Sequence, residues 1–168
     1  MLTNFDINSL SFNPFKVIGK QWMLITAGDQ EKCNTMTASW GSLGVLWNKN
    51  ISTIYVRPQR YTVEFLDKCD YYSLCLFGDA QRPALNYCGS HSGRDVDKIK
   101  ETGLTVLYDE KAPYFAEATD VLICRKLYCQ KIDPNCFIDQ SIHEANYPTP
   151  DYHNVYTGEI VKVLTKVK

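Results

Sequence analysis

Short stretches that favour β-strands, each followed by a turn residue, constrain this chain more than any other feature of its sequence. Residues 51–56 are rich in β-branched and aromatic types before Pro58, and residues 71–77 end at Gly78. Runs of this kind, separated by Gly, Pro, Asn or Asp, are typical of strands in all-β domains. The same criterion predicts strands over residues 22–27, 35–41, 51–56, 71–77, 104–108, 121–131 and 154–164.

Three segments interrupt this pattern and favour helices instead, at residues 62–68, 83–88 and 95–102. Pro83 suits the first turn of a helix, where its missing N–H has no partner to lose. Ser92 and Asp95 resemble a capping box with Ser92 as the N-cap, and Gly103 suits the C-terminal end of the same helix. Many short strands with a few short helices predict a mainly β fold, a β-barrel with peripheral helical inserts.

Length and composition place the chain among ordinary globular proteins. With 168 residues, we expect one domain that spans 1–168. Apolar residues make up 45% and charged residues 22%, which excludes disorder as a description of the whole chain. Lysine and arginine number 18 against 19 acidic residues, so no basic excess favours nucleic-acid binding. No apolar run approaches the ~20 residues that cross a bilayer, and the N-terminus lacks a signal-peptide pattern, so we expect a cytoplasmic protein that binds no membrane.

The seven cysteines lack the spacing of a disulfide framework or a metal site. No pair has C-x-x-C spacing, and the odd number occurs without a secretory signal. The alternative is a zinc site formed by Cys124, Cys129, Cys136 and His143, but their spacing does not provide paired ligands. We therefore expect buried free thiols and no bound metal. Sequences typical of dinucleotide-binding, P-loop and nucleophile-elbow enzymes are also absent.

The first candidate site is a stretch in which small hydroxyl residues alternate with apolar ones. It consists of Asn34, Thr35, Met36, Thr37, Ala38, Ser39 and Trp40. In a strand, its three hydroxyl side chains lie on one side and its apolar side chains on the other. A row of hydroxyl groups beside free backbone suits a planar ligand with polar edges, such as the pyrimidine ring of a flavin. The alternative is an ordinary edge strand, in which threonine only reflects β-propensity.

The second candidate is a pair of arginines at a predicted strand-to-helix junction. Arg57 and Arg60 lie on either side of Pro58, and the predicted helix begins near Thr62. Arginine forks match phosphate oxygens, and a helix N-terminus adds free N–H groups and a positive dipole end. These residues predict a phosphate cradle, and the alternative is two solvated arginines on a turn.

Two further segments combine groups that suit a ligand. Residues 92–95 bring a hydroxyl, a glycine and an arginine to a predicted helix start, where a small anion is favoured. A simple capping role for Ser92 is the compatible alternative. His153, at the entrance of the last predicted strand, could hydrogen-bond a ligand or donate a proton, and its alternative is an ordinary surface histidine.

The order of four sequence blocks resembles the flavin reductase-like family, in its flavoredoxin-type branch. These blocks read N-T-M-T-A-S-W-G, V-R-P-Q-R-Y-T, S-G-R-D-V-D-K and H-N-V-Y-T-G-E-I, and the resemblance extends from about residue 15 to residue 163. It implies an FMN-binding split β-barrel, a Greek key of about six strands with short peripheral helices. It also implies a homodimer with FMN at or near the dimer interface.

The resemblance gives each block a role. Residues 35–40 resemble the strand and turn beside the isoalloxazine ring. The block that matches the ribityl chain and phosphate consists of Arg57, Arg60, Tyr61 and Thr62. The loop that closes over the flavin is matched by Ser92, Gly93, Arg94 and Asp95, with Lys98 one turn further on. His153 occupies the position of a family histidine near the flavin or nicotinamide, although residues 147–150 before it depart from the family pattern.

The function that the resemblance implies is that of an FMN flavoprotein, an oxidoreductase that uses NAD(P)H to reduce flavin. Hydride would pass from the nicotinamide to flavin N5, and electrons would then pass to an acceptor such as free flavin or a redox protein. His153 is the one candidate catalytic residue. Two alternatives stay open: a non-enzymatic FMN-binding electron carrier or flavin store, and an interaction module that has lost its flavin.

Overall fold

One antiparallel sheet organises the computed structural model, which describes residues 1–166. Neighbouring strands follow the order β3-β2-β6-β9-β10-β5-β4, and β1 pairs with the far end of β10. A separate pair is formed by β7 and β8. The strands are β1 (Leu2–Asn4), β2 (Met23–Gly28), β3 (Cys33–Ala38), β4 (Gly41–Leu46), β5 (Lys49–Val56), β6 (Tyr71–Leu76), β7 (Val106–Leu107), β8 (Tyr114–Phe115), β9 (Asp120–Lys131) and β10 (Asn154–Lys166).

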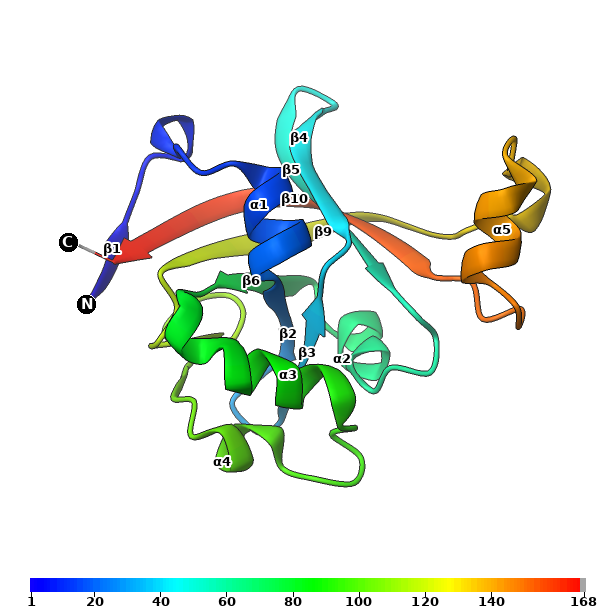
Figure 1. Ribbon diagram of the computed structural model, residues 1–168. Helices are drawn as coiled ribbons and strands as arrows, with labels where there is room; N and C mark the ends of the chain where they lie inside the picture. Colours follow the sequence, from blue (N-terminus) through cyan, green and yellow to red (C-terminus); the bar gives the residue numbers. More distant parts are fainter. Residues whose placement is uncertain (167–168) are drawn as a thin grey trace.

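The two longest strands, β9 and β10, pair along their length and run across the molecule (Figure 1). The first half of β9 also pairs with β6, and the first half of β10 pairs with β5. Register shifts at Thr157/Gly158 and Ile160/Lys162 bend this ribbon, as β-bulges do. Gly158 is required at the bend, because a Cβ there would lie 2.5 Å from the hydroxyl oxygen of the buried Tyr72. The bent ribbon joins the two halves of the sheet.

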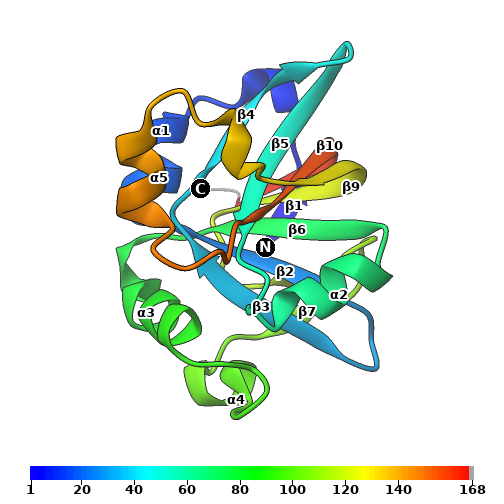
Figure 2. The same ribbon diagram turned by 90° about the vertical axis from the view of Figure 1, so that its right-hand side faces the viewer.

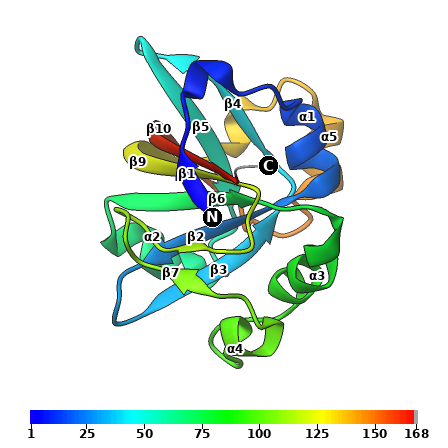
Figure 3. The ribbon, with the colours of Figure 1, turned by 90° about the vertical axis from the view of Figure 1, so that its left-hand side faces the viewer.

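Short helices occupy the connections between strands. They are α1 (Pro14–Lys16), α2 (Thr62–Lys68), α3 (Arg82–Ser90), α4 (Lys98–Thr102) and α5 (Gln140–Asn146). Figures 2 and 3 both show α3 and α4 together beside β3. Helix α5 lies at the end of the β9–β10 ribbon, in the long connection between these two strands (Figure 1).

Two apolar clusters pack on opposite faces of the strands β2, β6 and β9. Ile25 and Leu74 belong to the first cluster, whereas their neighbours Leu24 and Cys75 belong to the second. Leu85 of α3 packs into the second cluster. A strand that is buried on both faces is apolar along most of its length, which explains the apolar run in β2.

The predicted mainly β fold with short peripheral helices is confirmed, and each predicted strand overlaps an observed one. The main sheet has eight strands rather than about six. The predicted strand over 35–41 ends at Ala38, and a further strand, β4, begins at Gly41. Trp47 and Asn48, both at positive φ, connect β4 to β5. Because this two-residue turn has no glycine, the sequence carries little hairpin signal there.

The helix predicted over 95–102 begins later than expected, so its predicted capping box is wrong. Helix α4 begins at Lys98, and the Asp97 carboxylate caps it by accepting from Ile99 N and Lys100 N. Ser92 lies in a turn before the helix, where its carbonyl accepts from Asp95 N and Val96 N. Gly103 ends α4 at a φ of 67°, as predicted. Helix α5 was not predicted.

All seven cysteines are free thiols, but they are not all buried. Cys75, Cys88 and Cys124 are buried as expected, whereas Cys129 and Cys136 are exposed. Within residues 1–166, no three His, Cys, Asp or Glu side chains gather closely enough to hold a metal ion. No helix in the same range is both long and apolar enough to cross a membrane.

Candidate functional site

Two hollows border strand β3, and together they contain all but two of the predicted site residues. The β3–β4 hollow has a volume of about 240 Å³, and its predicted residues are Met36, Thr37, Ala38, Ser39, Trp40, Arg57, Arg60 and His153. The β3–α4 hollow has a volume of about 470 Å³, and its predicted residues are Asn34, Thr35, Tyr61, Gly93, Arg94, Asp95 and Lys98. Thr62 and Ser92 line neither of these hollows.

The alternating hydroxyl residues do not form a row of free groups, which corrects the sequence-based expectation. Thr35 Oγ1 lies 2.9 Å from Thr26 Oγ1 inside the sheet, and Thr37 Oγ1 donates to Leu85 O of α3 at 2.5 Å. Ser39 is exposed in the connection between β3 and β4, and its hydroxyl bonds to no group within residues 1–166. Ser39 is therefore the hydroxyl residue that can meet a ligand in the β3–β4 hollow.

Aromatic and apolar side chains form the rest of the β3–β4 hollow. Met36 and Ala38 are buried and reach it from the first apolar cluster. Trp40 is 45% exposed, and its ring centroid lies 5.1 Å from that of His153. Tyr55 of β5 completes the wall. A hollow that combines flat rings with polar side chains suits a planar aromatic ligand with polar edges.

His153 is buried at the entrance of β10, contrary to the alternative of an ordinary surface histidine. Its Nδ1 lies 2.8 Å from the hydroxyl oxygen of Tyr147. Burial, together with the nearby charge of Arg57, lowers the pKa of His153 to about 4. The imidazole is therefore neutral near pH 7, and it is a hydrogen-bonding group rather than a source of protons there.

The two arginines predicted to share one phosphate have different protein partners. Arg57 donates to Asp151 Oδ2 at 2.5 Å and to Asn146 O at 2.8 Å, which ties it to the chain around α5. Arg60 donates to Gly89 O at 2.9 Å, at the end of α3. Arg57 is therefore largely engaged, whereas Arg60 lines the β3–β4 hollow and has one side-chain hydrogen bond within residues 1–166.

Lys98 of the β3–α4 hollow lies close to Arg60 of the β3–β4 hollow, and we call the place of these two cations the junction of the hollows. Only 5% of the Lys98 residue is exposed, and its Nζ donates to Thr35 O and Cys88 O, each at 2.9 Å. Cys88 and Gly89 are adjacent, so the two cations hold neighbouring carbonyls of α3. Burial and the charge of Arg60 lower the pKa of Lys98 to about 8. The fold thus brings together two like charges, one from the lining of each hollow.

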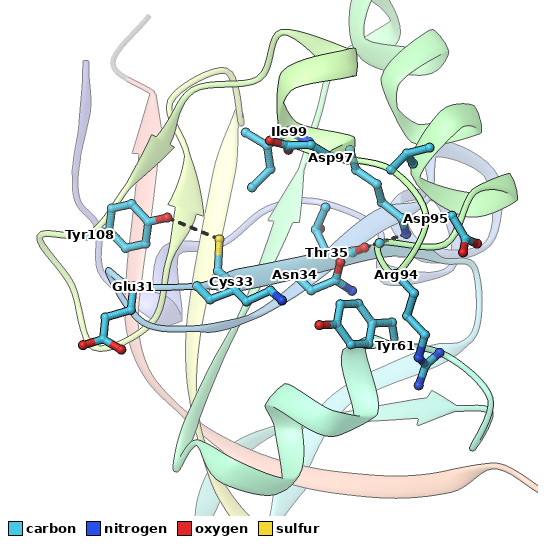
Figure 4. A pocket seen from close by; sticks show the side chains of 14 residues that line it. Glu31, Cys33, Asn34, Thr35, Tyr61, Arg94, Asp95, Asp97, Ile99 and Tyr108 are labelled. Atoms are coloured by element: carbon cyan, nitrogen blue, oxygen red, sulfur yellow. Dashed lines mark hydrogen bonds between the residues drawn. The ribbon is translucent and has the colours of Figure 1, made fainter.

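The β3–α4 hollow lies between β3 and the loop that leads into α4 (Figure 4). A Cβ on Gly93 would lie 2.0 Å from Asn34 Oδ1 and 3.1 Å from the Tyr61 ring, so this loop needs glycine. Asn34 Nδ2 donates to Thr62 Oγ1 at 2.8 Å, and both residues are buried. Figure 4 shows Tyr61 and Arg94 together on the side of β3 opposite α4, where the Arg94 guanidinium lies 4.7 Å from the Tyr61 ring centroid.

Two predicted anion contacts in this region have protein partners instead. Arg94 donates to Glu64 Oε1 at 2.6 Å, and the Ser92 hydroxyl accepts from Arg94 N at 3.2 Å. Two backbone N–H groups at the start of α2 also have partners, because Val63 N donates to Arg60 O and Glu64 N donates to Tyr61 O. The free N–H groups expected at this helix start are therefore fewer than predicted.

Tyr55 and Tyr147 are site residues that sequence reasoning missed. Tyr55 alternates with the buried Ile54 and Val56, so strand periodicity could have placed it on the opposite face, beside the arginine block. Tyr147 follows the unpredicted helix α5 and contacts His153, six residues later, across the loop before β10. No local pattern identifies such a contact.

The sheet has the split-barrel fold, which several similar solved structures share. A flavoredoxin of Methanosarcina acetivorans matches with a TM-score of 0.69 and 24% identity, over 98% of this chain and 76% of its own. An FMN-binding domain of a flavin reductases-like enzyme from Shewanella baltica matches with a TM-score of 0.70 and 16% identity, over 98% and 77%. An NADH:FAD oxidoreductase of Streptomyces globisporus matches with a TM-score of 0.65 and 18% identity, over 87% and 74%.

The flavin reductase like domain model matches residues 15–166, which is nearly the whole chain. The chain therefore belongs to the flavin reductase-like family, and the predicted split-barrel fold is confirmed. No curated protein sequence matches the chain.

Proposed function

We propose that this chain, as a single domain over residues 1–168, binds FMN across the two hollows and reduces it with NAD(P)H. The observation that carries the proposal is the cation pair of Arg60 and Lys98 at the junction of the hollows. Like charges at short range raise each other's free energy, and the charge of Arg60 adds to the larger effect of burial in lowering the pKa of Lys98. A phosphate dianion beside the pair offsets that repulsion and gains charge-assisted hydrogen bonds.

The donors and the space around the junction fit this cofactor. Lys98 uses two of its three ammonium protons on carbonyls and Arg60 has one hydrogen bond to Gly89, so both retain donors for phosphate oxygens. Gly93 has no Cβ, so its loop approaches the Asn34 side chain closely beside the β3–α4 hollow. The β3–β4 hollow, at about 240 Å³, is smaller than most ligand pockets, so a whole nucleotide needs both hollows.

Bound FMN supplies the hydride acceptor, N5, for a nicotinamide cofactor. The chain's own residues bind and orient the reactants. Arg60 and Lys98 hold the phosphate, while Ser39 and Trp40 border the flavin ring in the β3–β4 hollow. His153 stays neutral near pH 7 and donates a hydrogen bond without releasing its proton. The acceptor of the electrons would be free flavin or a redox protein.

The small volume of the β3–β4 hollow favours a second candidate function, that of a non-enzymatic FMN-binding electron carrier. A flavin ring that fills about 240 Å³ leaves little room beside it for a nicotinamide. Anaerobic addition of NADH or NADPH to the FMN-loaded protein separates the two functions. Prompt loss of the oxidised flavin absorbance supports the reductase, and persistent absorbance supports the carrier.

The phosphate assignment is tested by Lys98→Met, with Lys100→Met as the matched control on the same helix. Lys100 is exposed and outside both hollows. Loss of one charge-assisted hydrogen bond, about 1.5–3 kcal/mol, should raise the dissociation constant of FMN at least tenfold in Lys98→Met. Riboflavin, which lacks the phosphate, should bind both variants alike. Equal FMN affinity in the two lysine variants contradicts the assignment.

We further propose that the chain forms a homodimer through the tip of the β4–β5 hairpin. Val45, Leu46 and Trp47 are 73%, 42% and 53% exposed, and Tyr128 of β9 lies beside Trp47 at 6.2 Å between ring centroids. Apolar groups gathered on a surface indicate an interaction site. Light scattering should give twice the chain mass, and Trp47→Lys should shift that mass toward the monomer. A monomeric mass for the unmodified protein contradicts this proposal.

A further inference from the structure

The connection between β9 and β10 contributes to the β3–β4 hollow, and Arg57 fastens it there. We name residues 132–153 the α5 segment. Arg57 bonds to Asp151 Oδ2 and Asn146 O, and its guanidinium carbon lies 5.3 Å from the Tyr147 ring centroid. Gln59 Nε2 donates to the same Asp151 oxygen at 2.9 Å. These contacts of Arg57 hold Tyr147 in position against His153.

The contact between Tyr147 and His153 has a defined direction. Only 6% of each residue is exposed, and the two rings meet edge-on at 5.6 Å and 83°. The Tyr147 hydroxyl, 2.8 Å from Nδ1, makes no second hydrogen bond within residues 1–166. If Nδ1 donated to it, the hydroxyl proton would be buried without an acceptor, which is costly. The hydroxyl therefore donates to Nδ1, and the ring proton resides on Nε2.

We infer that Tyr147 is a positioning residue that holds His153 in the Nε2–H tautomer. In this form, His153 is a neutral hydrogen-bond donor to a carbonyl oxygen of a ring bound in the β3–β4 hollow. This inference rests on the proposed function, since the ring belongs either to the flavin or to the nicotinamide. Both rings carry carbonyl oxygens at their edges, and a neutral N–H recognises either. Tyr147, the first residue of the stretch 147–150 that departs from the family pattern, thus supports the site through His153.

The charged and titratable groups around the imidazole agree with a neutral donor. Arg57 faces it from the end of β5, Asp151 precedes it in the α5 segment, and Tyr55 and Tyr147 line the same region. The Arg57 cation opposes a second positive charge on His153. Asp151 favours that charge, but its Oδ2 is bonded to Arg57 and Gln59. The imidazole is therefore a donor without being an acid near pH 7.

The test compares Tyr147→Phe with Tyr152→Phe. Tyr147→Phe keeps the ring against Arg57 and His153 and removes only the hydroxyl. Tyr152 is a matched control, because its hydroxyl lies 2.9 Å from Nε2 of His143, another histidine of the α5 segment, and outside the β3–β4 hollow. Both variants lose one tyrosine–histidine hydrogen bond, so a purely structural effect should change both to a similar extent.

Nitrogen-15 NMR of the histidine rings in the flavin-free protein gives the first readout. The unmodified protein and Tyr152→Phe should show His153 as the Nε2–H tautomer, and Tyr147→Phe should show a mixture. An Nδ1–H tautomer in the unmodified protein, or no change in Tyr147→Phe, overturns the inference. Because this measurement needs no cofactor, it is informative even if FMN fails to bind, which would refute the proposed function instead.

Binding and kinetics give the second readout. Tyr147→Phe should weaken one affinity by about twofold to tenfold, the range of one neutral hydrogen bond. A raised dissociation constant for FMN assigns the carbonyl to the flavin, and a raised KM for the nicotinamide cofactor with unchanged FMN affinity assigns it to the nicotinamide. Unchanged values for both, or equal changes in Tyr152→Phe, overturn the positioning role.

Discussion

Replacement of Gly93 by alanine should destabilise the protein by disturbing the buried contact between the α4 loop and β3. The new Cβ would lie 2.0 Å from Asn34 Oδ1 and 3.1 Å from the Tyr61 ring. Asn34 is only 6% exposed and donates to Thr62 Oγ1, so its side chain cannot move away without losing that hydrogen bond. Overpacking costs about 1–3 kcal/mol, and a broken buried hydrogen bond adds about 1 kcal/mol. We therefore expect a loss of about 2–4 kcal/mol in the free energy of unfolding.

Urea unfolding and thermal melting measure this loss directly. For a chain of this size, 1 kcal/mol lowers the Tm by about 2–4 °C, so Gly93→Ala should melt roughly 5–15 °C lower. Gly44→Ala is the control, because no atom lies within 4 Å of the Cβ it would add. FMN affinity should fall in Gly93→Ala, since the loop borders the junction that holds Lys98. Equal Tm and equal FMN affinity in the two alanine variants would refute the close approach of Gly93 to Asn34.

Three further predictions concern acid stability, the α5 segment and the thiols. His153 has a folded pKa of about 4, below its ordinary 6.5, so stability should fall by up to about 3 kcal/mol as the pH drops from 6.5 toward 4. Denaturant titrations at pH 7 and pH 4.5 should show this drop, and the drop should be smaller in His153→Gln. An equal drop in His153→Gln contradicts the prediction. Arg57→Gln should speed hydrogen exchange in the α5 segment without changing exchange in α3, and unchanged exchange contradicts the fastening role. A thiol reagent should label the exposed Cys129 and Cys136 in the native protein but not Cys75, because burial raises the pKa of Cys75 to about 12. Labelling of Cys75 in the native protein contradicts its burial.

The strands could be predicted because their signals are local. Residues 51–56 and 71–77 carry β-branched and aromatic side chains, and both became strands at nearly the expected bounds. The hairpin tip at Trp47 and Asn48 could not be predicted, because its turn lacks the glycine that usually marks one. The sequence predicts too early a start for α4, because Ser92 and Asp97 are both good caps and only tertiary packing decides between them.

The candidate site was predictable as a set of segments but not as a set of contacts. Most of the predicted residues do border two neighbouring hollows. Which of them are free depends on partners far away in the sequence. Arg57 is engaged by Asp151, 94 residues later, and Lys98 is buried against Thr35 O, 63 residues earlier. The spacing of residues within a motif cannot predict pairs that are separated by this many residues.

The comparison of FMN with riboflavin as ligands of the unmodified protein tests the central claim most directly. The two molecules share the same ring system, and only FMN has the phosphate that we place between Arg60 and Lys98. Fluorescence titration should give a dissociation constant for FMN at least tenfold below that for riboflavin, the effect of one charge-assisted hydrogen bond of about 1.5 kcal/mol or more. Equal affinities for the two ligands, or no binding of FMN, would contradict the account.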